Sequence, residues 1–208
     1  LEAFKNKEAD ILLGTQMVAK GHDFPDVSLV GILSADSFLF SSDYRASERT
    51  FQLITQASGR AGRGKVAGRV ILQAYNVDDY AVRAGIAQDY EMFYNAEISM
   101  RQKFISPPFC HIGTVIVSGE NEANVKKSIK RLKENIMEKF RESKGFICSE
   151  ALPCPVNIIR NRYRWRIIIK MASINKLVEL MNYTVDVYDK LAAKGTSLAV
   201  DIDPASMI

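Results

Sequence analysis

Cysteine and histidine are scarce in this sequence of 208 residues, which holds three and two of them respectively. The cysteines, Cys110, Cys148 and Cys154, form no Cys-x-x-Cys pair. We therefore expect no disulfide framework and no local zinc site, but free buried thiols in a reducing cytoplasm. No apolar run reaches membrane-spanning length, and the first residues, Leu-Glu-Ala-Phe-Lys, lack the apolar core of a signal peptide. An initiator methionine is also absent, so we expect a piece of a longer protein that meets no membrane.

Hydrophobic residues make up 47% of the chain, an ordinary value for a soluble protein with a buried core. The net charge of +4 is unevenly distributed: residues 101–170 hold fifteen Lys or Arg against six Asp or Glu. Such a basic block is typical of a nucleic-acid footprint. For residues 126–144 a solvated helix face explains the charge equally well, so both interpretations stay open.

The first half of the chain predicts an α/β domain with a parallel sheet. Short apolar runs bounded by Gly, Pro, Asp or Asn predict strands at about 11–15, 27–33 and 69–75. Helical spacing predicts a helix over 45–58 with Asp43 as its N-cap, and further helices over 79–87 and 89–103. Two consecutive prolines, Pro107 and Pro108, cannot continue a helix. We therefore place the domains at 1–105 and 109–208.

The second domain predicts alternating strands and helices in the order β-α-β-β-α-β. Strands are expected at 111–118, 147–151, 158–171 and 197–202, and amphipathic helices at 124–142 and 174–193. This order is typical of the split-βαβ, ferredoxin-like α+β fold.

One stretch carries a candidate chemical site: Gln56-Ala57-Ser58-Gly59-Arg60-Ala61-Gly62-Arg63-Gly64. Arg60 and Arg63 are three residues apart, which would place them on one face of a helix. Guanidinium groups are rigid, permanently charged forks that suit phosphate, so the pair could clamp the charge that develops in phosphoryl transfer. A glycine-rich helix end with solvated arginines would give the same pattern.

The upstream string Leu13-Gly14-Thr15-Gln16-Met17 … Lys20-Gly21-His22-Asp23-Phe24-Pro25 strengthens the first interpretation. Together with the arginine stretch it resembles motifs V and VI of superfamily 2 helicases, and in detail the bacterial replication-restart helicases. The resemblance runs along the whole chain. It implies that residues 1–105 are the second half of a RecA-like motor lobe carrying motifs V and VI. It also implies a zinc region, with paired cysteines, upstream of this chain.

The resemblance assigns roles to individual residues. Arg60 and Arg63 would contact the γ-phosphate of ATP, and Gln56 would couple the nucleotide state to lobe closure. Gly21 and Asp23 would line the nucleotide, and Thr15 would contact a DNA phosphate. No Gly-x-x-x-x-Gly-Lys-Ser/Thr loop occurs in the sequence. ATP and Mg²⁺ would therefore need a first lobe outside this chain, and the chain alone should not hydrolyse ATP.

A second candidate surface is the strand Arg160-Asn161-Arg162-Tyr163-Arg164-Trp165-Arg166. Side chains alternate along a strand, so the arginines at 160, 162, 164 and 166 would share one face, and Tyr163 and Trp165 the other. We expect the aromatic face to pack under the helices. The arginine face could follow DNA phosphates, be a solvated outer strand, or bind partner proteins.

The function that the resemblance implies is ATP-dependent 3′→5′ DNA unwinding in replication restart and primosome assembly. The partners would be forked and single-stranded DNA, other restart proteins and single-stranded-DNA-binding protein. We expect a monomer in the bacterial cytoplasm, at the nucleoid. The alternative is a non-catalytic DNA- or protein-binding module on a motor-like scaffold.

Overall fold

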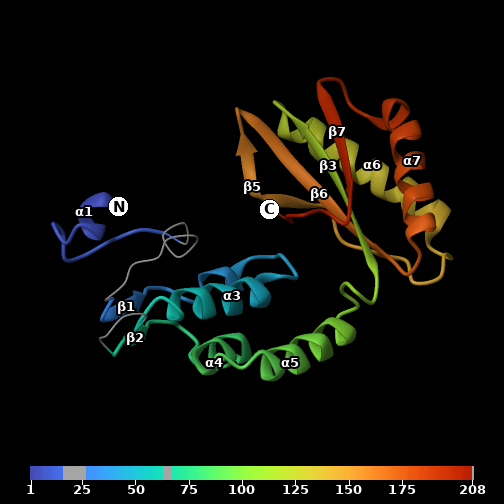
Figure 1. Ribbon diagram of the computed structural model, residues 1–208. Helices are drawn as coiled ribbons and strands as arrows, with labels where there is room; N and C mark the ends of the chain where they lie inside the picture. Colours follow the sequence, from blue (N-terminus) through green and yellow to red (C-terminus); the bar gives the residue numbers. More distant parts are fainter. Residues whose placement is uncertain (16–26, 63–66, 208) are drawn as a thin grey trace. The chain divides into compact units, whose positions relative to one another are not determined.

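The structure is a computed structural model that describes residues 1–15, 27–62 and 67–207. The chain divides into two compact units, Leu1–Ser99 and Met100–Ile208 (Figure 1). In the part of the chain that the structure describes, no helix is both long enough and apolar enough to cross a bilayer.

The first unit contains a small parallel sheet covered by helices. Its elements are α1 (Glu2–Lys5), β1 (Leu29–Ile32), the 3₁₀ helix η1 (Ser37–Phe40), α3 (Ala46–Ser58), β2 (Arg69–Leu72), α4 (Tyr80–Ala87) and most of α5 (Tyr90–Lys103). β1 and β2 pair in parallel, with Val30 opposite Val70. A cluster of buried side chains joins the strands to the helices: Ile32, Ala35, Ile54, Ala57 and Val82.

The helices of this unit pack through apolar stripes at helical spacing. The buried residues of α3 are Ala46, Thr50, Phe51, Ile54 and Ala57. Phe51 stacks on Phe93 of α5 with 4.4 Å between ring centroids. α4 begins at Asp79, whose carboxylate accepts a hydrogen bond from Ala81 N. These patterns explain why the three predicted helices are found within a residue or two of their expected limits.

Two predictions for this unit are wrong. Residues 11–15 form no strand, and Ile11 and Leu13 are 85% and 87% exposed. An apolar run becomes a strand only where a neighbouring strand accepts its backbone hydrogen bonds. Asp43 is also not the N-cap of α3, because the helix begins after Arg45 and no side chain caps it.

The second unit is an antiparallel sheet with two long helices. Its elements are β3 (His111–Gly119), α6 (Glu122–Phe140), β4 (Ile147–Cys148), β5 (Leu152–Ile159), β6 (Arg162–Met171), α7 (Ile174–Leu191) and β7 (Thr196–Ile202). The strand order is β4-β6-β3-β7, and β5 also pairs with β6. β6 therefore lies inside the sheet and is not the outer strand that one interpretation of the sequence proposed.

Both helices of the second unit pack on one face of this sheet. Asn121 and Ser173 cap α6 and α7 by accepting hydrogen bonds from the backbone N–H groups of Asn124 and Lys176. The core between sheet and helices is aliphatic, with fully buried side chains from every layer: Val115, Val117, Ile129, Leu132, Ile136, Ile167, Ile169, Leu177 and Leu180. The amphipathic periodicity that predicted the helices is thus the periodicity of this core.

One contact between β3 and α7 uses the space left by a residue without a side chain. A Cβ atom added at Gly113 would lie 1.9 Å from Met181 Cε and 3.0 Å from Leu177 Cδ1. Two carbon atoms cannot approach to 1.9 Å, so the thioether of Met181 occupies the space that a side chain at position 113 would need.

The long strand predicted over 158–171 is in fact the end of one strand, a turn and a second strand. β5 ends at Ile159 and β6 begins at Arg162, which pairs with it. The two residues between them, Arg160 and Asn161, have φ angles of 50° and 59°. Two-residue hairpins of this kind require such left-handed backbone, which asparagine tolerates better than most residues.

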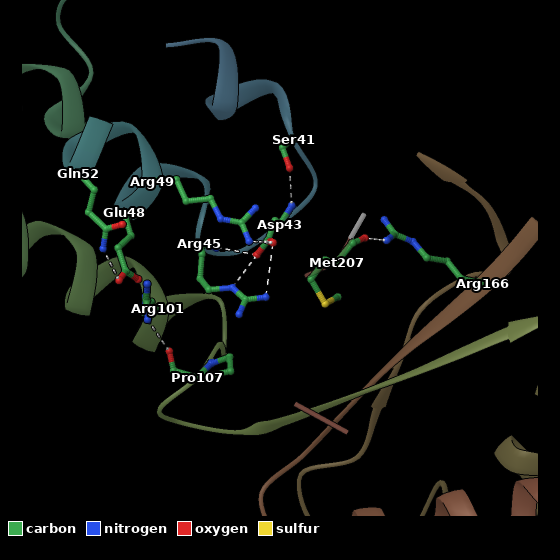
Figure 2. Close-up of polar contacts among 10 residues, drawn as sticks. All are labelled: Ser41, Asp43, Arg45, Glu48, Arg49, Gln52, Arg101, Pro107, Arg166 and Met207. Atoms are coloured by element: carbon green, nitrogen blue, oxygen red, sulfur yellow. Dashed lines mark hydrogen bonds and ion pairs between the residues drawn. The ribbon is translucent and has the colours of Figure 1, made fainter. Parts of the chain in front are cut away.

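The last residues fold back over the open face of the sheet, the face without helices. At Asp203 the chain turns with a φ of 47°, and its carboxylate accepts a hydrogen bond from Ile112 N at 2.9 Å. The other carboxylate oxygen lies 2.8 Å from Nδ1 of His111. Met207 is buried, and its carbonyl accepts a hydrogen bond from Arg166 (Figure 2). The C-terminal segment is therefore part of the folded unit.

Candidate nucleotide and nucleic-acid contact sites

The helix α3 positions the residues of the arginine stretch. Its buried stripe faces the strands and α4, which leaves Gln56 on the exposed side. The helix ends at Ser58, and Gly59 is its C-cap, with its N–H donating to Thr55 O at 3.0 Å. Gln56 thus lies in the last turn of a helix whose opposite face is fixed by packing.

Arg60 lies in a tight turn beyond this helix. Its backbone N–H donates to Ala57 O at 3.1 Å, and two residues later Gly62 N donates to Val27 O at 3.1 Å. A Cβ atom added at Gly68 would lie 2.2 Å from Gly62 N, so this turn packs directly against the backbone that leads into β2. The side chain of Arg60 is half-buried. Its backbone is therefore held by a helix end and by the segments that lead into both strands.

The prediction from helical spacing required Arg60 to lie on a helix. Because α3 ends at Ser58, Arg60 is outside the helix, and the i, i+3 relation to Arg63 does not place the two side chains on one helical face. Arg63, Gly21 and Asp23 lie outside the described residues. Thr15 is exposed and belongs to no helix or strand.

The buried carboxylate of Asp43, predicted from the sequence as a helix N-cap, instead binds two arginines and organises the segment before α3. Asp43 Oδ1 accepts hydrogen bonds from the backbone N–H of Arg45 at 3.0 Å and from its Nε at 3.1 Å (Figure 2). Arg49 Nη2 lies 3.1 Å from Asp43 Oδ2. The signal in the sequence was an aspartate followed by arginines two and six residues later. This ion-pair cluster fixes the entry to the helix that carries Gln56.

Asp36 joins the carboxyl ends of the two parallel strands. It is buried, and its Oδ2 accepts hydrogen bonds from Tyr75 N at 2.8 Å and Asn76 N at 2.9 Å. Ala35 N donates to Gln73 O at 2.9 Å beside it. The segments that follow β1 and β2 are thereby held together at the edge of the sheet where ligands of α/β proteins commonly bind.

The arginines of the hairpin do not form one open row. Arg160 lies at the turn and is exposed. Arg162 Nη2 donates to Ser118 O at 3.2 Å and Ser197 Oγ at 2.9 Å, and Arg164 Nη1 donates to Val156 O at 3.3 Å. Arg166, only 8% exposed, lies under the C-terminal segment with its guanidinium on the carbonyl of Met207. The prediction of four arginines on an open face is therefore wrong for Arg166, because the tail covers it.

The aromatic side of β6 packs as expected. Trp165 and Tyr163 are half-buried against the core under the helices. Trp165 Nε1 donates to Glu122 Oε1 at 3.3 Å, and Lys126 Nζ lies 4.9 Å from the centre of the indole ring. This polar edge anchors the start of α6 to the middle of the sheet.

Comparison with known proteins matches both halves of the chain. A family model described as "Primosomal protein N C-terminal domain" matches residues 102–205, and one described as "Helicase conserved C-terminal domain" matches residues 1–65. The "Replication restart protein PriA" of Bacillus subtilis is 37% identical over 209 residues, covering 100% of this chain and 26% of its own length. This chain belongs to the PriA family.

Other PriA proteins show the same extent of similarity. The "Replication restart protein PriA" of Synechocystis sp. is 35% identical, and the match covers 100% of this chain and 24% of that protein. The "Replication restart protein PriA" of Chlamydia pneumoniae is 34% identical, and the match covers 98% of this chain and 27% of that protein. The chain spans about a quarter of the length of these relatives. Among solved structures, the designed protein Foldit4 aligns with 47% of this chain and 99% of its own, at a TM-score of 0.35 and 16% identity, too low to support a statement on fold.

The cysteines of this PriA chain are free thiols, as expected. Burial raises the pKa of Cys148 to about 11, and it also raises the pKa of Cys110 and of Cys154. Over the described ranges 1–15, 27–62 and 67–207, no three His, Cys, Asp or Glu side chains gather as a metal site would need.

Proposed function

We propose that this chain is the C-terminal part of an ATP-dependent DNA helicase that unwinds DNA 3′→5′ at stalled forks and helps assemble the primosome. The observation that carries the proposal is the position of Arg60. It lies at the end of the helicase-like segment 1–65, in a turn held by α3, by Val27 and by Gly68. A group that stabilises transition-state charge has to be held in place before the reaction, and this turn is suited to that.

The architecture supports a division into a motor lobe and a ferredoxin-like domain, with limits at 1–105 and 109–208. A helix connects the two parallel strands of the first unit, as in RecA-like lobes. Leu29, Val70 and Ile71 are exposed on those strands, whereas parallel sheets are usually covered on both faces, which favours further covering segments in the longer protein. The strand order β4-β6-β3-β7, with both helices on one face, is the order of a split-βαβ fold.

In this proposal the chain contributes one side of an ATP site. Arg60 and Arg63 would neutralise charge on the γ-phosphate, Gln56 would couple the nucleotide to lobe closure, and Gly21 and Asp23 would line the nucleotide. Mg²⁺ would be held by a first lobe and zinc by an upstream region, both outside this chain. The 208 residues alone should therefore turn over no ATP.

The DNA contacts of the proposal are Thr15 on the motor side and the exposed end of the hairpin on the other. Arg160 is exposed, and Arg162 and Arg164 are only half-buried, so these three could meet phosphates. Arg166 is not included, because the tail covers it. Forked and single-stranded DNA, other restart proteins and single-stranded-DNA-binding protein are the proposed partners of a monomer in the cytoplasm.

The test is the ATPase rate of the full-length protein with Arg60→Ala. Loss of a transition-state contact should lower kcat on the order of 10³-fold and leave KM nearly unchanged. Arg83→Ala is the matched control, because Arg83 is an exposed arginine of α4 far along the chain from the motif. Near wild-type turnover by the Arg60 variant would reject the finger assignment and favour a non-catalytic binding module.

A further inference from the structure

One edge of the antiparallel sheet is open for further pairing. β7 is the outermost strand and pairs only with β3 among the described residues. Asp203 N donates to Ile112 O at 2.7 Å, which fixes which backbone groups of β7 face β3. Since these alternate along an antiparallel strand, the N–H and C=O groups of Leu198, Val200 and Ile202 point away from the sheet. These three alternate residues of β7 can therefore form backbone hydrogen bonds with a further strand at the edge of the sheet.

The two edges of the sheet differ in how they are protected. At the opposite edge β4 has only two residues, and β5 contains Pro153 and Pro155 and a break in register between Pro153 and Ile158. Short strands, prolines and bulges are the usual means of preventing a sheet edge from pairing with another chain. β7 is seven residues long, Thr-Ser-Leu-Ala-Val-Asp-Ile, with no proline, glycine or lysine and no register break.

An apolar stripe of α7 runs beside this free edge. Tyr183 marks the side of α7 that faces α6, because its hydroxyl donates to Asn135 Oδ1 at 2.5 Å. Ile174, Val178 and Val185 lie about half a turn around the helix from Tyr183, on the side of α7 away from α6, and α7 packs on β7. They are 37%, 39% and 50% exposed. A strand added to β7 would place alternate side chains on this stripe.

The charges near the edge indicate what such a strand would carry. Asp201 projects from β7 on the open face, and Asp189 lies on α7 next to the apolar stripe; both are exposed. Among the residues that the structure describes, neither forms an ion pair. Asp189 follows Tyr188, whose hydroxyl donates to Thr196 Oγ1, so Asp189 lies near the start of β7, where Arg162 donates to Ser197 Oγ; Asp201 lies at the other end. The end of the edge near Ile202 is therefore acidic.

We infer that β7 and the α7 stripe bind an extended segment of another protein as an added strand. The segment would carry branched apolar residues at alternate positions, facing α7, and Lys or Arg between them, facing Asp201. Backbone hydrogen bonds would supply affinity, and the alternating side chains would supply specificity. A second copy of this chain is the poorer complement, because its own β7 brings another Asp201 and no basic residue.

The experiment uses the 208-residue chain and a soluble peptide in which Val and Lys alternate over the seven-residue length of β7. Calorimetry should show saturable binding, and amide NMR shifts should centre on Leu198, Val200 and Ile202. The same peptide with N-methyl groups on alternate residues cannot donate to β7 and should bind about tenfold more weakly. A peptide with Glu in place of Lys should also lose affinity.

Variants of the chain separate the edge from the rest of the surface. Val200→Pro removes a donor that β3 does not use and should weaken peptide binding about tenfold. Asp201→Lys should weaken it about threefold, whereas Asp186→Lys, on the outer side of α7, should leave it unchanged. If Val200→Pro unfolds the unit, Val178→Asp on the stripe gives the same test.

Three outcomes would overturn the inference. The first is binding that N-methylation does not weaken. The second is equal effects of Asp201→Lys and Asp186→Lys. The third is a chain that binds no peptide but sediments as a dimer that Val200→Pro dissociates, because the edge would then belong to a second copy.

Discussion

The salt dependence of DNA binding gives the sharpest test of the hairpin arginines. Arg160, Arg162 and Arg164 provide three cations that are exposed or half-buried. Each phosphate contact to a single strand contributes about −0.7 to the slope of log affinity against log salt, so three contacts give about −2. Raising salt fourfold, from about 50 to about 200 mM, should then lower the affinity of the chain for a single-stranded oligonucleotide about 16-fold.

The double substitution Arg162→Ala and Arg164→Ala should leave one contact. The slope should fall to about −0.7, and the same change in salt should lower affinity only about threefold. Both side chains also donate to backbone carbonyls, so the Arg→Gln pair, which keeps hydrogen-bond donors, is a second variant that separates charge from packing. The measurement is anisotropy of an end-labelled strand over a salt series.

The matched control variant removes two positive charges from a different face of the second unit. Lys127 and Arg131 are exposed on α6, on the helix side of the sheet. Changing both to alanine should leave the slope near −2 if the hairpin meets DNA. An unchanged slope in the hairpin variant would refute the assignment of these arginines. A slope flattened only in the α6 variant would move the nucleic-acid footprint to the basic helix.

Two further predictions concern the second unit. Gly113→Ala should destabilise it by about 1–3 kcal/mol in urea unfolding, because the new methyl group meets Met181 Cε. Met181→Ala should cost less in the Gly113→Ala background than in the wild type, because the new methyl group fills part of the cavity; equal stability of wild type and Gly113→Ala would contradict this contact. Cys148, with its pKa raised from 9.0 to about 11, should react about 100-fold more slowly with iodoacetamide at about pH 8 than an unperturbed thiol. The sign follows from burial, which favours the protonated thiol. Mass spectrometry measures the rate, and rapid modification in the folded state would contradict the burial.

The long helices could be predicted from sequence because their signal is local. α6 and α7 each bury one stripe over four or five turns, and polar caps mark their starts at Asn121 and Ser173. Residues 11–15 carried an equally apolar pattern, yet Ile11 and Leu13 are exposed. A strand depends on a partner elsewhere in the chain, and local composition does not reveal whether that partner is present.

The errors at the hairpin and at Arg166 have different physical causes. The apolar run over 158–171 predicted one strand, but it contains a two-residue turn at Arg160 and Asn161 that separates β5 from β6. Arg166 followed the alternation of its strand correctly, but the tail returns to it, and Met207 O accepts a hydrogen bond from its guanidinium. Likewise Arg60 was expected on a helix, but α3 ends two residues earlier. Contacts between segments that are distant in the sequence produce no periodic pattern, so they could not be predicted from it.

Trp165 makes the second unit separately observable in solution. It is the only tryptophan of the chain, half-buried beneath α6 with Glu122 and Lys126 at its polar edge. Its emission spectrum therefore reports the unfolding of one unit, whereas far-ultraviolet circular dichroism reports the helices of both. Coincident transitions by the two methods would mean that the units melt as one cooperative body, and separated transitions would give each unit its own stability.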